Sequence, residues 1–318
     1  MLGLIVLIQT LTVAVTGPAS SSEYLPLRVA ETQGYFKREG LNVVIKTTRA
    51  EVGAAEALAQ GQVDLAATSL EAIVRFGPRQ AHQMSRMIFG LTAAPPVALL
   101  ATTSLAGTVS AVKNLAGLRV GVATPGAPEH AWLNAILSRA GVPLTQIDLV
   151  SLGTRGLVVA IETGDVQAGL VTEPFASRLL SDRAASVLAD LRTPGAVTKT
   201  LGAPTVNAAI FGRKDRMPRD TDLAAFARAV IAAEKLIAET HPEALAERLP
   251  PSLVGTPDEF SRRVETTREI YLPDGTVTPQ QLSETIEIIR NYGPLPATLK
   301  MPKPEEFIHQ VALTRRSR

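Results

Sequence analysis

Cysteine is absent from the 318 residues of this chain. The protein therefore has no disulfide bond, no thiolate ligand for a metal ion and no cysteine nucleophile. Aromatic residues make up only 4% of the sequence, which argues against a platform for stacking single-stranded nucleic acid. The 32 basic residues nearly balance the 30 acidic ones and are dispersed along the chain, so the sequence predicts no nucleic-acid partner.

Long apolar runs are scarce as well, since no segment reaches the roughly 20 apolar residues of a membrane span. The start, Met1–Ile8, is apolar like the core of a signal peptide, but no basic residue precedes it. The small residues at Gly17-Pro18-Ala19 offer a cleavage site, yet cleavage there would remove a strand predicted at Leu11–Thr16. We therefore favour residues 1–10 as a signal-peptide remnant over a short signal that ends at Ala19. Both interpretations predict a periplasmic or extracytoplasmic protein, in solution or tethered to the membrane at its N-terminus.

The chain has enough apolar residues, 46%, to fill the cores of two ordinary lobes. Short apolar runs predict eight strands: Leu11–Thr16, Leu41–Lys46, Asp64–Thr68, Val97–Thr102, Leu118–Ala123, Ile147–Ser151, Ala168–Thr172 and Val206–Phe211. Helical patterns such as Leu25–Arg38 and Leu70–Phe76 lie between them. This alternation is typical of parallel sheets with crossover helices. Four glycines that follow helical runs are predicted left-handed C-caps: Gly40, Gly61, Gly141 and Gly164.

From about Arg213 the pattern becomes helical. Five segments are predicted as helices: Asp222–Thr240, Pro242–Leu249, Pro257–Tyr271, Pro279–Asn291 and Pro304–Leu313. Asp222 is the expected N-cap of the first of them. We expect these helices to pack back onto the first lobe.

The two halves of the chain repeat one pattern. Leu11–Pro18 (LTVAVTGP) matches Leu118–Pro125 (LRVGVATP) at an offset of 107 residues (118 − 11). Ala57–Asp64 (ALAQGQVD) matches Ala160–Gln167 (AIETGDVQ) at an offset of 103 residues (160 − 57). Chance similarity among common α/β patterns is the alternative. A genuine repeat implies two similar lobes with a cleft between them, where small ligands tend to bind.

Four segments, in this order and spacing, carry a resemblance to a known family: Ala30–Val43 (AETQGYFKREGLNV), Ala57–Ala66 (ALAQGQVDLA), Val112–Val122 (VKNLAGLRVGV) and Glu173-Pro-Phe175. The sequence resembles the periplasmic binding proteins for sulfonates, nitrate, taurine and thiamine pyrimidines, from about Leu11 to Leu313. The resemblance implies an α/β, type II periplasmic-binding-protein fold. Each lobe would be a mostly parallel sheet flanked by helices.

The resemblance also implies where the lobes divide. Lobe 1 would comprise residues 11–98 and 210–318, and lobe 2 residues 99–209. Two chain crossings near Val97–Thr102 and Thr205–Gly212 would form the hinge. The implied partners are a small solute and an ABC permease in the membrane, and the implied state is a monomer without a cofactor.

In open parallel sheets, ligands bind beyond the carboxyl ends of the strands, where loops lead into helix N-termini. After the first strand comes a hydroxyl-rich loop, whose candidate solute contacts are Ser20, Ser21, Ser22 and Tyr24. The alternative is that Ser20 or Ser22 is only an N-cap. After the third strand, Ser69 is expected to cap a helix while Thr68 faces the cleft.

Two further loops belong to the second half. Candidate contacts in the first are Thr124, Gly126, Ala127 and His130. Members of the resembled family often carry Gly-Ser-Ser here, so Gly126-Ala127 keeps backbone donors but loses the hydroxyls. In the second loop, Glu173 is a candidate acceptor for a ring amine or amino group, or else a solvated carboxylate at a helix start.

Two further candidates lie outside these loops. Arg155 is the candidate cation for a solute carboxylate, and Asn207 is a further donor. The alternative for Arg155 is an ordinary exposed surface arginine.

Three classes of function remain open. We favour an import receptor, which closes on its solute and needs no catalytic residue. The first alternative is an enzyme on the same fold, such as a lyase of the menaquinone-pathway type, in which His130 would move a proton with Glu129 or Glu173. Related desulfinases and pyrimidine synthases use cysteine, which is absent here. The second alternative is a solute sensor. The histidines show no metal-ligand spacing, so no metal site is expected.

Overall fold

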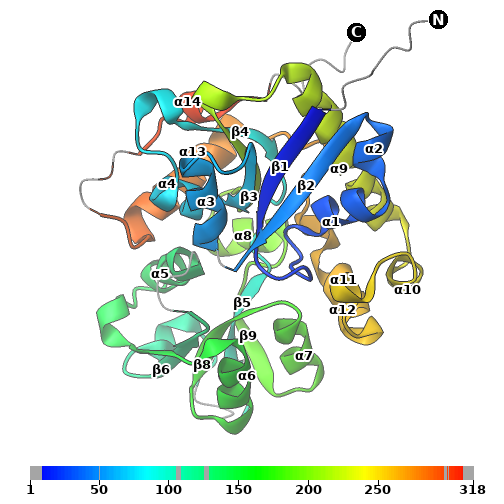
Figure 1. Ribbon diagram of the computed structural model, residues 1–318. Coiled ribbons are helices and arrows are strands. Elements are labelled where there is room, and N and C mark those ends of the chain that lie inside the picture. The colour runs from blue at the N-terminus through cyan, green and yellow to red at the C-terminus, as the bar shows by residue number, and fades with distance from the viewer. Residues whose placement is uncertain are drawn as a thin grey trace, which may run out of the picture.

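Two mixed β-sheets of five strands each form the centres of two lobes, drawn one above the other in Figure 1. The computed structural model describes residues 9–49, 51–104, 109–124, 129–296, 299 and 301–310. This is the two-lobed α/β architecture that the sequence predicts. No helix within these ranges is both long and apolar enough to span a membrane.

The first sheet has the strand order β2-β1-β3-β10-β4. Its strands are β1 (Gln9–Thr16), β2 (Leu41–Thr48), β3 (Leu65–Ser69), β4 (Ser85–Gly90) and β10 (Ala208–Arg213). β1 runs parallel to β2 and β3, whereas β10 runs antiparallel to both β3 and β4.

The second sheet has the order β7-β6-β8-β5-β9. Its strands are β5 (Val97–Thr102), β6 (Arg119–Val122), β7 (Asp148–Ser151), β8 (Ala168–Thr172) and β9 (Ala185–Asp190). β6 runs parallel to β7 and β8, and here β5 is the antiparallel strand. The chain passes between the sheets through residues 91–96 and 191–207.

The predicted internal repeat is confirmed by these two strand orders, which become identical when β1 is matched to β6, β3 to β8 and β10 to β5. Matched residues also make matched hydrogen bonds. Asp64 N donates to Thr12 O at 2.9 Å, and Gln167 N donates to Arg119 O at 3.0 Å. In return, Thr12 N donates to Asp64 Oδ2 at 2.8 Å and Arg119 N donates to Gln167 Oε1 at 3.0 Å. The repeat therefore preserves side-chain roles as well as strand order.

Helices accompany both sheets (Figure 1). The first half contributes α1 (Leu25–Thr32), α2 (Tyr35–Arg38), α3 (Glu51–Ala59) and α4 (Leu70–Phe76) to the first lobe. The second lobe has α5 (Glu129–Arg139), α6 (Gly153–Thr163), α7 (Phe175–Ser181) and α8 (Pro194–Leu201). The C-terminal helices are α9 (Asp220–Glu239), α10 (Pro242–Ala246), α11 (Pro251–Val254), α12 (Pro257–Thr267), α13 (Pro279–Tyr292) and α14 (Pro304–Phe307).

The C-terminal helices pack onto the first lobe, as predicted. Helix α9 lies against α1 and α2, and the Phe36 ring stacks on Phe226 with the centroids 5.0 Å apart. Two of these helices also reach the second lobe, because α13 contacts α5 and α12 contacts α7.

Helix α13 joins the second connecting segment to the second lobe. Near the middle of the helix, Thr285 Oγ1 accepts a hydrogen bond of 2.9 Å from Val206 N. At the end of the helix, Tyr292 O accepts a hydrogen bond of 2.9 Å from Asn134 Nδ2 on α5. One helix thus contacts both the link between the lobes and the opposite lobe.

Several helix boundaries differ from the prediction. Helix α10 ends at Ala246 where an end at Leu249 was predicted, and α14 ends at Phe307 where an end at Leu313 was predicted. The single helix expected at Leu25–Arg38 is interrupted at Gly34, whose φ of 70° is left-handed and ends α1 before α2 begins. Asp222 is not an N-cap: α9 begins at Asp220, and the Asp222 carboxylate accepts a 2.7 Å hydrogen bond from Arg219 Nε in the first turn. The four predicted C-cap glycines all have positive φ and are confirmed.

A buried acid on α9 makes the stability of the first lobe depend on pH. Glu234 is 4% exposed, and its carboxyl oxygens have no hydrogen-bond partner within the described residues. Burial, assisted by the charge of Asp274, raises the pKa of Glu234 to about 9. The folded protein therefore retains a proton that the unfolded chain loses near pH 4.5, and stability should fall as the pH rises from about 4.5 to 9.

Replacing this acid tests that dependence. Glu234→Gln should raise the free energy of unfolding at pH 8 by at least about 2 kcal/mol and flatten its fall between pH 5 and 9. Urea unfolding across this pH range measures both effects. Glu239→Gln, at an exposed position on the same helix, is the matched control and should change neither. A variant Glu234→Gln with the same pH profile as the parent protein would contradict the assignment.

Candidate functional site

The antiparallel strands show where the two sheets face each other. Ala208, the first residue of β10, pairs with Ser69 at the end of β3, and Val97, the first residue of β5, pairs with Thr172 at the end of β8. Each strand that receives the chain from the other lobe therefore starts beside the carboxyl end of a parallel strand. These carboxyl ends consequently lie on the edges that face the opposite lobe, where the sequence predicts the solute site.

The loop after β1 divides into surface and core residues. Ser20 and Ser21 are half-buried, and Ser21 Oγ donates to Glu23 Oε2 at 2.8 Å. Ser22 and Tyr24 are buried, and Ser22 O accepts a 2.8 Å hydrogen bond from the Tyr271 hydroxyl. The N-cap of α1 is Tyr24, so neither Ser20 nor Ser22 has the capping role that we considered.

The loop after β3 begins a helix as expected. Ser69 is the N-cap of α4, and its Oγ accepts a 3.1 Å hydrogen bond from Ala72 N, which confirms the predicted cap. Thr68 is fully buried, so its hydroxyl is not exposed to the cleft in this structure.

The structure describes only part of the loop after β6. Thr124 is exposed, whereas Gly126 and Ala127 lie outside the described residues. His130 is half-buried at the start of α5. Burial lowers the pKa of His130, opposed by a hydrogen bond to the Thr124 backbone and assisted by the positive charge of Arg75 on α4. The charge of Arg75 thus acts on His130 from the first lobe, and burial favours the neutral imidazole.

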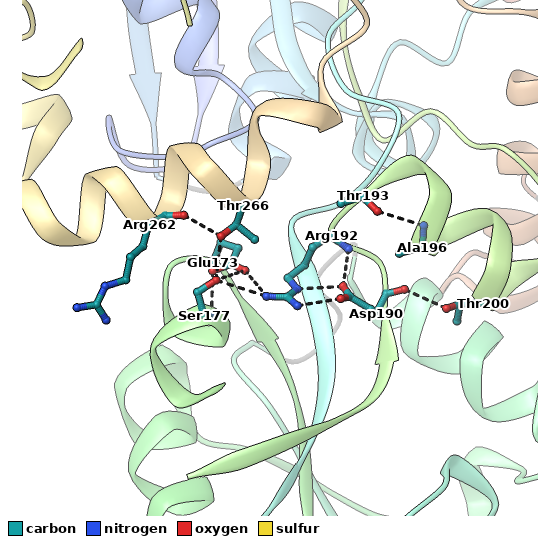
Figure 2. Close-up of polar contacts among 9 residues, drawn as sticks. All are labelled: Glu173, Ser177, Asp190, Arg192, Thr193, Ala196, Thr200, Arg262 and Thr266. Carbon is teal, nitrogen blue, oxygen red and sulfur yellow. Dashed lines mark hydrogen bonds and ion pairs between the residues drawn. The ribbon is translucent and has the colours of Figure 1, made fainter. Parts of the chain in front are cut away.

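Glu173 is the centre of a buried polar cluster in the second lobe (Figure 2). Its side chain is 0% exposed. Ser177 N donates to Glu173 Oε2 at 3.1 Å, while Ser177 Oγ and Arg192 Nη1 both donate to Oε1 at 2.9 Å. The carboxylate is therefore satisfied by the protein itself, and it is not the solvated carboxylate considered as an alternative.

Arg192 connects Glu173 to a second acid, Asp190. Arg192 Nε and Nη2 donate to the two Asp190 oxygens at 2.9 and 2.8 Å, an in-plane bidentate pair. Burial opposes ionisation of both residues, but their mutual hydrogen bonds raise the pKa of Arg192 and lower that of Asp190. Two carboxylates around one guanidinium give this cluster a net negative charge. Asp190 and Arg192 were not among the predicted site residues, because the strand β9 that precedes Arg192 was not predicted.

The two remaining candidates lie apart from this cluster. Arg155 is exposed in the first turn of α6. Asn207 is buried beside the start of β10, where its N donates to Thr92 O and its O accepts from Leu70 N, both at 2.8 Å. Asn207 thereby ties the second connecting segment to the first residue of α4.

Two cavities open between the lobes in the described part of the chain. One of about 550 Å³ lies between α5 and the end of α13, and one of about 420 Å³ lies between α7 and the start of α12. None of the predicted solute contacts within the described residues lines either cavity. Among the described residues no group of three or more histidine, aspartate or glutamate side chains could hold a metal ion.

The sequence profile of the NMT1/THI5-like family matches residues 21–247, which is more than half of the chain. The chain belongs to the NMT1/THI5-like family. No curated protein matches this family member in sequence.

Solved structures share the fold of this NMT1/THI5-like protein. A protein from Bordetella bronchiseptica RB50 has 22% sequence identity and a TM-score of 0.77, with 96% of each chain covered. The periplasmic aliphatic sulphonate binding protein SsuA from Escherichia coli has 16% identity and a TM-score of 0.71, covering 95% of this chain and 92% of its own. The periplasmic nitrate-binding protein NrtA from Synechocystis PCC 6803 has 12% identity and a TM-score of 0.63, covering 97% and 88%.

Breaking the buried ion pair should destabilise the second lobe. Arg192→Met would leave the Glu173 charge buried without its cation, and it should lower the free energy of unfolding by about 3 kcal/mol. Urea unfolding monitored by circular dichroism measures this loss. Arg178→Met on α7 removes a half-exposed ion pair with Glu162 and should cost less than about 1 kcal/mol.

A double variant separates the buried charge from general packing. Adding Glu173→Gln to Arg192→Met removes the unpaired charge, so the double variant should be more stable than Arg192→Met alone. If the free energies of unfolding lost in the two single variants simply add in the double variant, the pairing of Glu173 with Arg192 does not stabilise the lobe.

Proposed function

We propose that this protein is the extracytoplasmic solute-binding subunit of an ABC importer. The observation that carries this proposal is the duplicated lobe: two sheets of one plan, joined by only two segments, with the carboxyl ends of their parallel strands on facing edges. Such a molecule is suited to hinge closure around a ligand. We assign residues 11–96 and 208–318 to lobe 1 and residues 97–207 to lobe 2. Both crossings fall two residues earlier than the sequence predicts, because β5 begins at Val97 in the second sheet and β10 begins at Ala208 in the first. The proposed partners are the solute and a membrane permease that recognises the closed form of a monomer.

The proposed solute is a small organic anion or heterocycle. The sulfonate- and nitrate-binding proteins that share the fold support this class. In this chain the accessible candidates are Ser20 and Ser21 in lobe 1 and Thr124, His130 and Arg155 in lobe 2. Hydroxyls, backbone amides at helix starts and a cation are the groups that hold small oxyanions.

The remaining candidates have a supporting role in this proposal. Ser22, Tyr24, Thr68 and Asn207 are buried and shape the loops from behind. Ser69 fixes the start of α4 through its cap. Glu173 positions Arg192 and the start of α7, since its oxygens are already occupied. The net charge of this cluster also implies that an anion binds away from it, nearer the opposite side of the cleft.

Of the two carboxylates considered for the lyase alternative, Glu129 and Glu173, the contacts of Glu173 count against it. That mechanism needs His130 and a carboxylate acting together as proton carriers. Glu173 accepts three hydrogen bonds from Ser177 and Arg192, so it is not available as a base. A solute sensor would use the same binding site and would differ only in the protein to which it signals.

A thermal-shift screen tests the proposal directly. The purified protein is heated with methanesulfonate, nitrate, taurine, a thiamine pyrimidine and benzoate, and each mixture is analysed afterwards for chemical change. A ligand at about 100 times its dissociation constant adds about 2.7 kcal/mol of stability, which raises the melting temperature by several degrees. We expect one class of compound to give this shift and to be recovered unchanged.

Variants show whether a hit binds in the interlobe cleft. Arg155→Met should reduce the shift for an anionic hit, while Arg119→Met, an exposed arginine at the other end of the same lobe, should leave it unchanged. Consumption of the compound would refute the receptor function in favour of an enzyme. A shift insensitive to every cleft variant would place the ligand elsewhere.

A further inference from the structure

One side-chain hydrogen bond joins the lobes beside the buried cluster. Ser177 on α7 of lobe 2 and Thr266 on α12 of lobe 1 place their hydroxyl oxygens 3.0 Å apart (Figure 2). Ser177 Oγ also contacts Glu173 Oε1 at 2.9 Å, and Thr266 Oγ1 contacts Arg262 O at 2.7 Å. The bond therefore links helix α12 to the charged interior of the opposite lobe.

Each hydroxyl has only one proton, which limits how these contacts are made. The hydroxyls of Ser177 and Thr266 together carry two protons. Three contacts each require a hydroxyl proton: Ser177 with Glu173, Thr266 with Arg262 O, and the contact between the two hydroxyls. Only two of the three exist at one time. Closing the lobes therefore requires one hydroxyl to give up its existing partner.

Thr266 is the residue that gives up its partner. A hydrogen bond to an ionised carboxylate is roughly twice as strong as one to a neutral acceptor, so Ser177 keeps its proton on Glu173. Arg262 O is a helical carbonyl that still accepts the backbone amide of Thr266, so losing the hydroxyl leaves it satisfied. Either hydroxyl can be the donor in the contact between Ser177 and Thr266. In this assignment Thr266 donates to Ser177, Ser177 donates to Glu173, and Arg192 balances the carboxylate from the other side.

We propose that Thr266, Ser177 and Glu173 form a closure latch, a hydrogen-bond chain that stabilises the closed arrangement of the lobes without contacting the solute. The latch rests on the proposed function, in which the lobes open and close. It is reversible because Thr266 can return its proton to Arg262 O when the lobes part. Ser177 remains bonded to Glu173, so opening leaves no buried charge without a partner.

The absence of cysteine permits a direct test in the protein without any solute. Ser177→Cys combined with Thr266→Cys places two thiols at the latch, and mild oxidation should join them rapidly into a disulfide. Ser177→Cys with Glu265→Cys is the matched control, because Glu265 is the exposed neighbour of Thr266 on α12. We expect at least 10-fold faster cross-linking of the latch pair. Equal rates for the two pairs in folded protein would overturn the proposal.

A second pair of variants tests the hydrogen bond itself. Thr266→Val removes the donor with little change of shape, whereas Thr266→Ser retains it. Fluorescence energy transfer between labels on the two lobes should show a 2- to 10-fold larger ratio of open to closed molecules for the valine variant, as expected for one net hydrogen bond. The serine variant should match the parent protein. No difference between the two variants would overturn the latch.

The two proposals can fail separately. A latch pair that cross-links while no compound gives a thermal shift would count against the solute receptor alone. A compound that gives a shift in a protein whose latch pair does not cross-link would count against the latch alone.

Discussion

Each sheet contains one strand that runs against its parallel neighbours, and the two-lobed shape depends on it. A helix that connects two parallel strands returns the chain to the far end of its own sheet, so such connections never leave a lobe. A chain that crosses from one lobe to the other enters the sheet of the lobe it reaches at the edge that faces the lobe it has left. The strand that follows the crossing must therefore run away from that edge. β5 and β10 do this, starting beside the ends of β8 and β3. The direction of two strands thus fixes both the hinge and the edges that face each other.

Much of this arrangement can be predicted from the sequence because it depends on strongly apolar central strands. All eight predicted strands exist, and the 107-residue echo (118 − 11) correctly matches β1 with β6. The two missed strands, β4 and β9, each lie at one edge of their sheet. β9 is partly exposed and ends in Asp190, so its sequence (ASVLAD) lacks the apolar pattern of a central strand. Helix α8 was missed because its Pro194-Gly195 start resembles a turn.

The candidate site was less predictable for a related reason. The rule that ligands bind beyond the carboxyl ends of strands selects loops, but it does not say which side chains turn inward. Ser22, Tyr24 and Thr68 lie in selected loops and are nevertheless buried. Arg192 follows an edge strand that the pattern did not indicate, and its partner Glu173 looks from sequence like an ordinary acid at a helix start. Whether each of these side chains is buried or exposed depends on packing against residues that are distant in the sequence.

Helix α13 acts mechanically as a rigid arm. Thr285 holds it to the second connecting segment and Tyr292 holds it to α5. These two residues are seven helical steps apart (292 − 285), or about 10 Å along the helix axis. A rotation of about 10° at the connecting segment would move the Tyr292 end by nearly 2 Å, enough to break its hydrogen bond to Asn134. Small torsional changes at the hinge are thereby amplified into the loss or gain of a discrete contact with the opposite lobe.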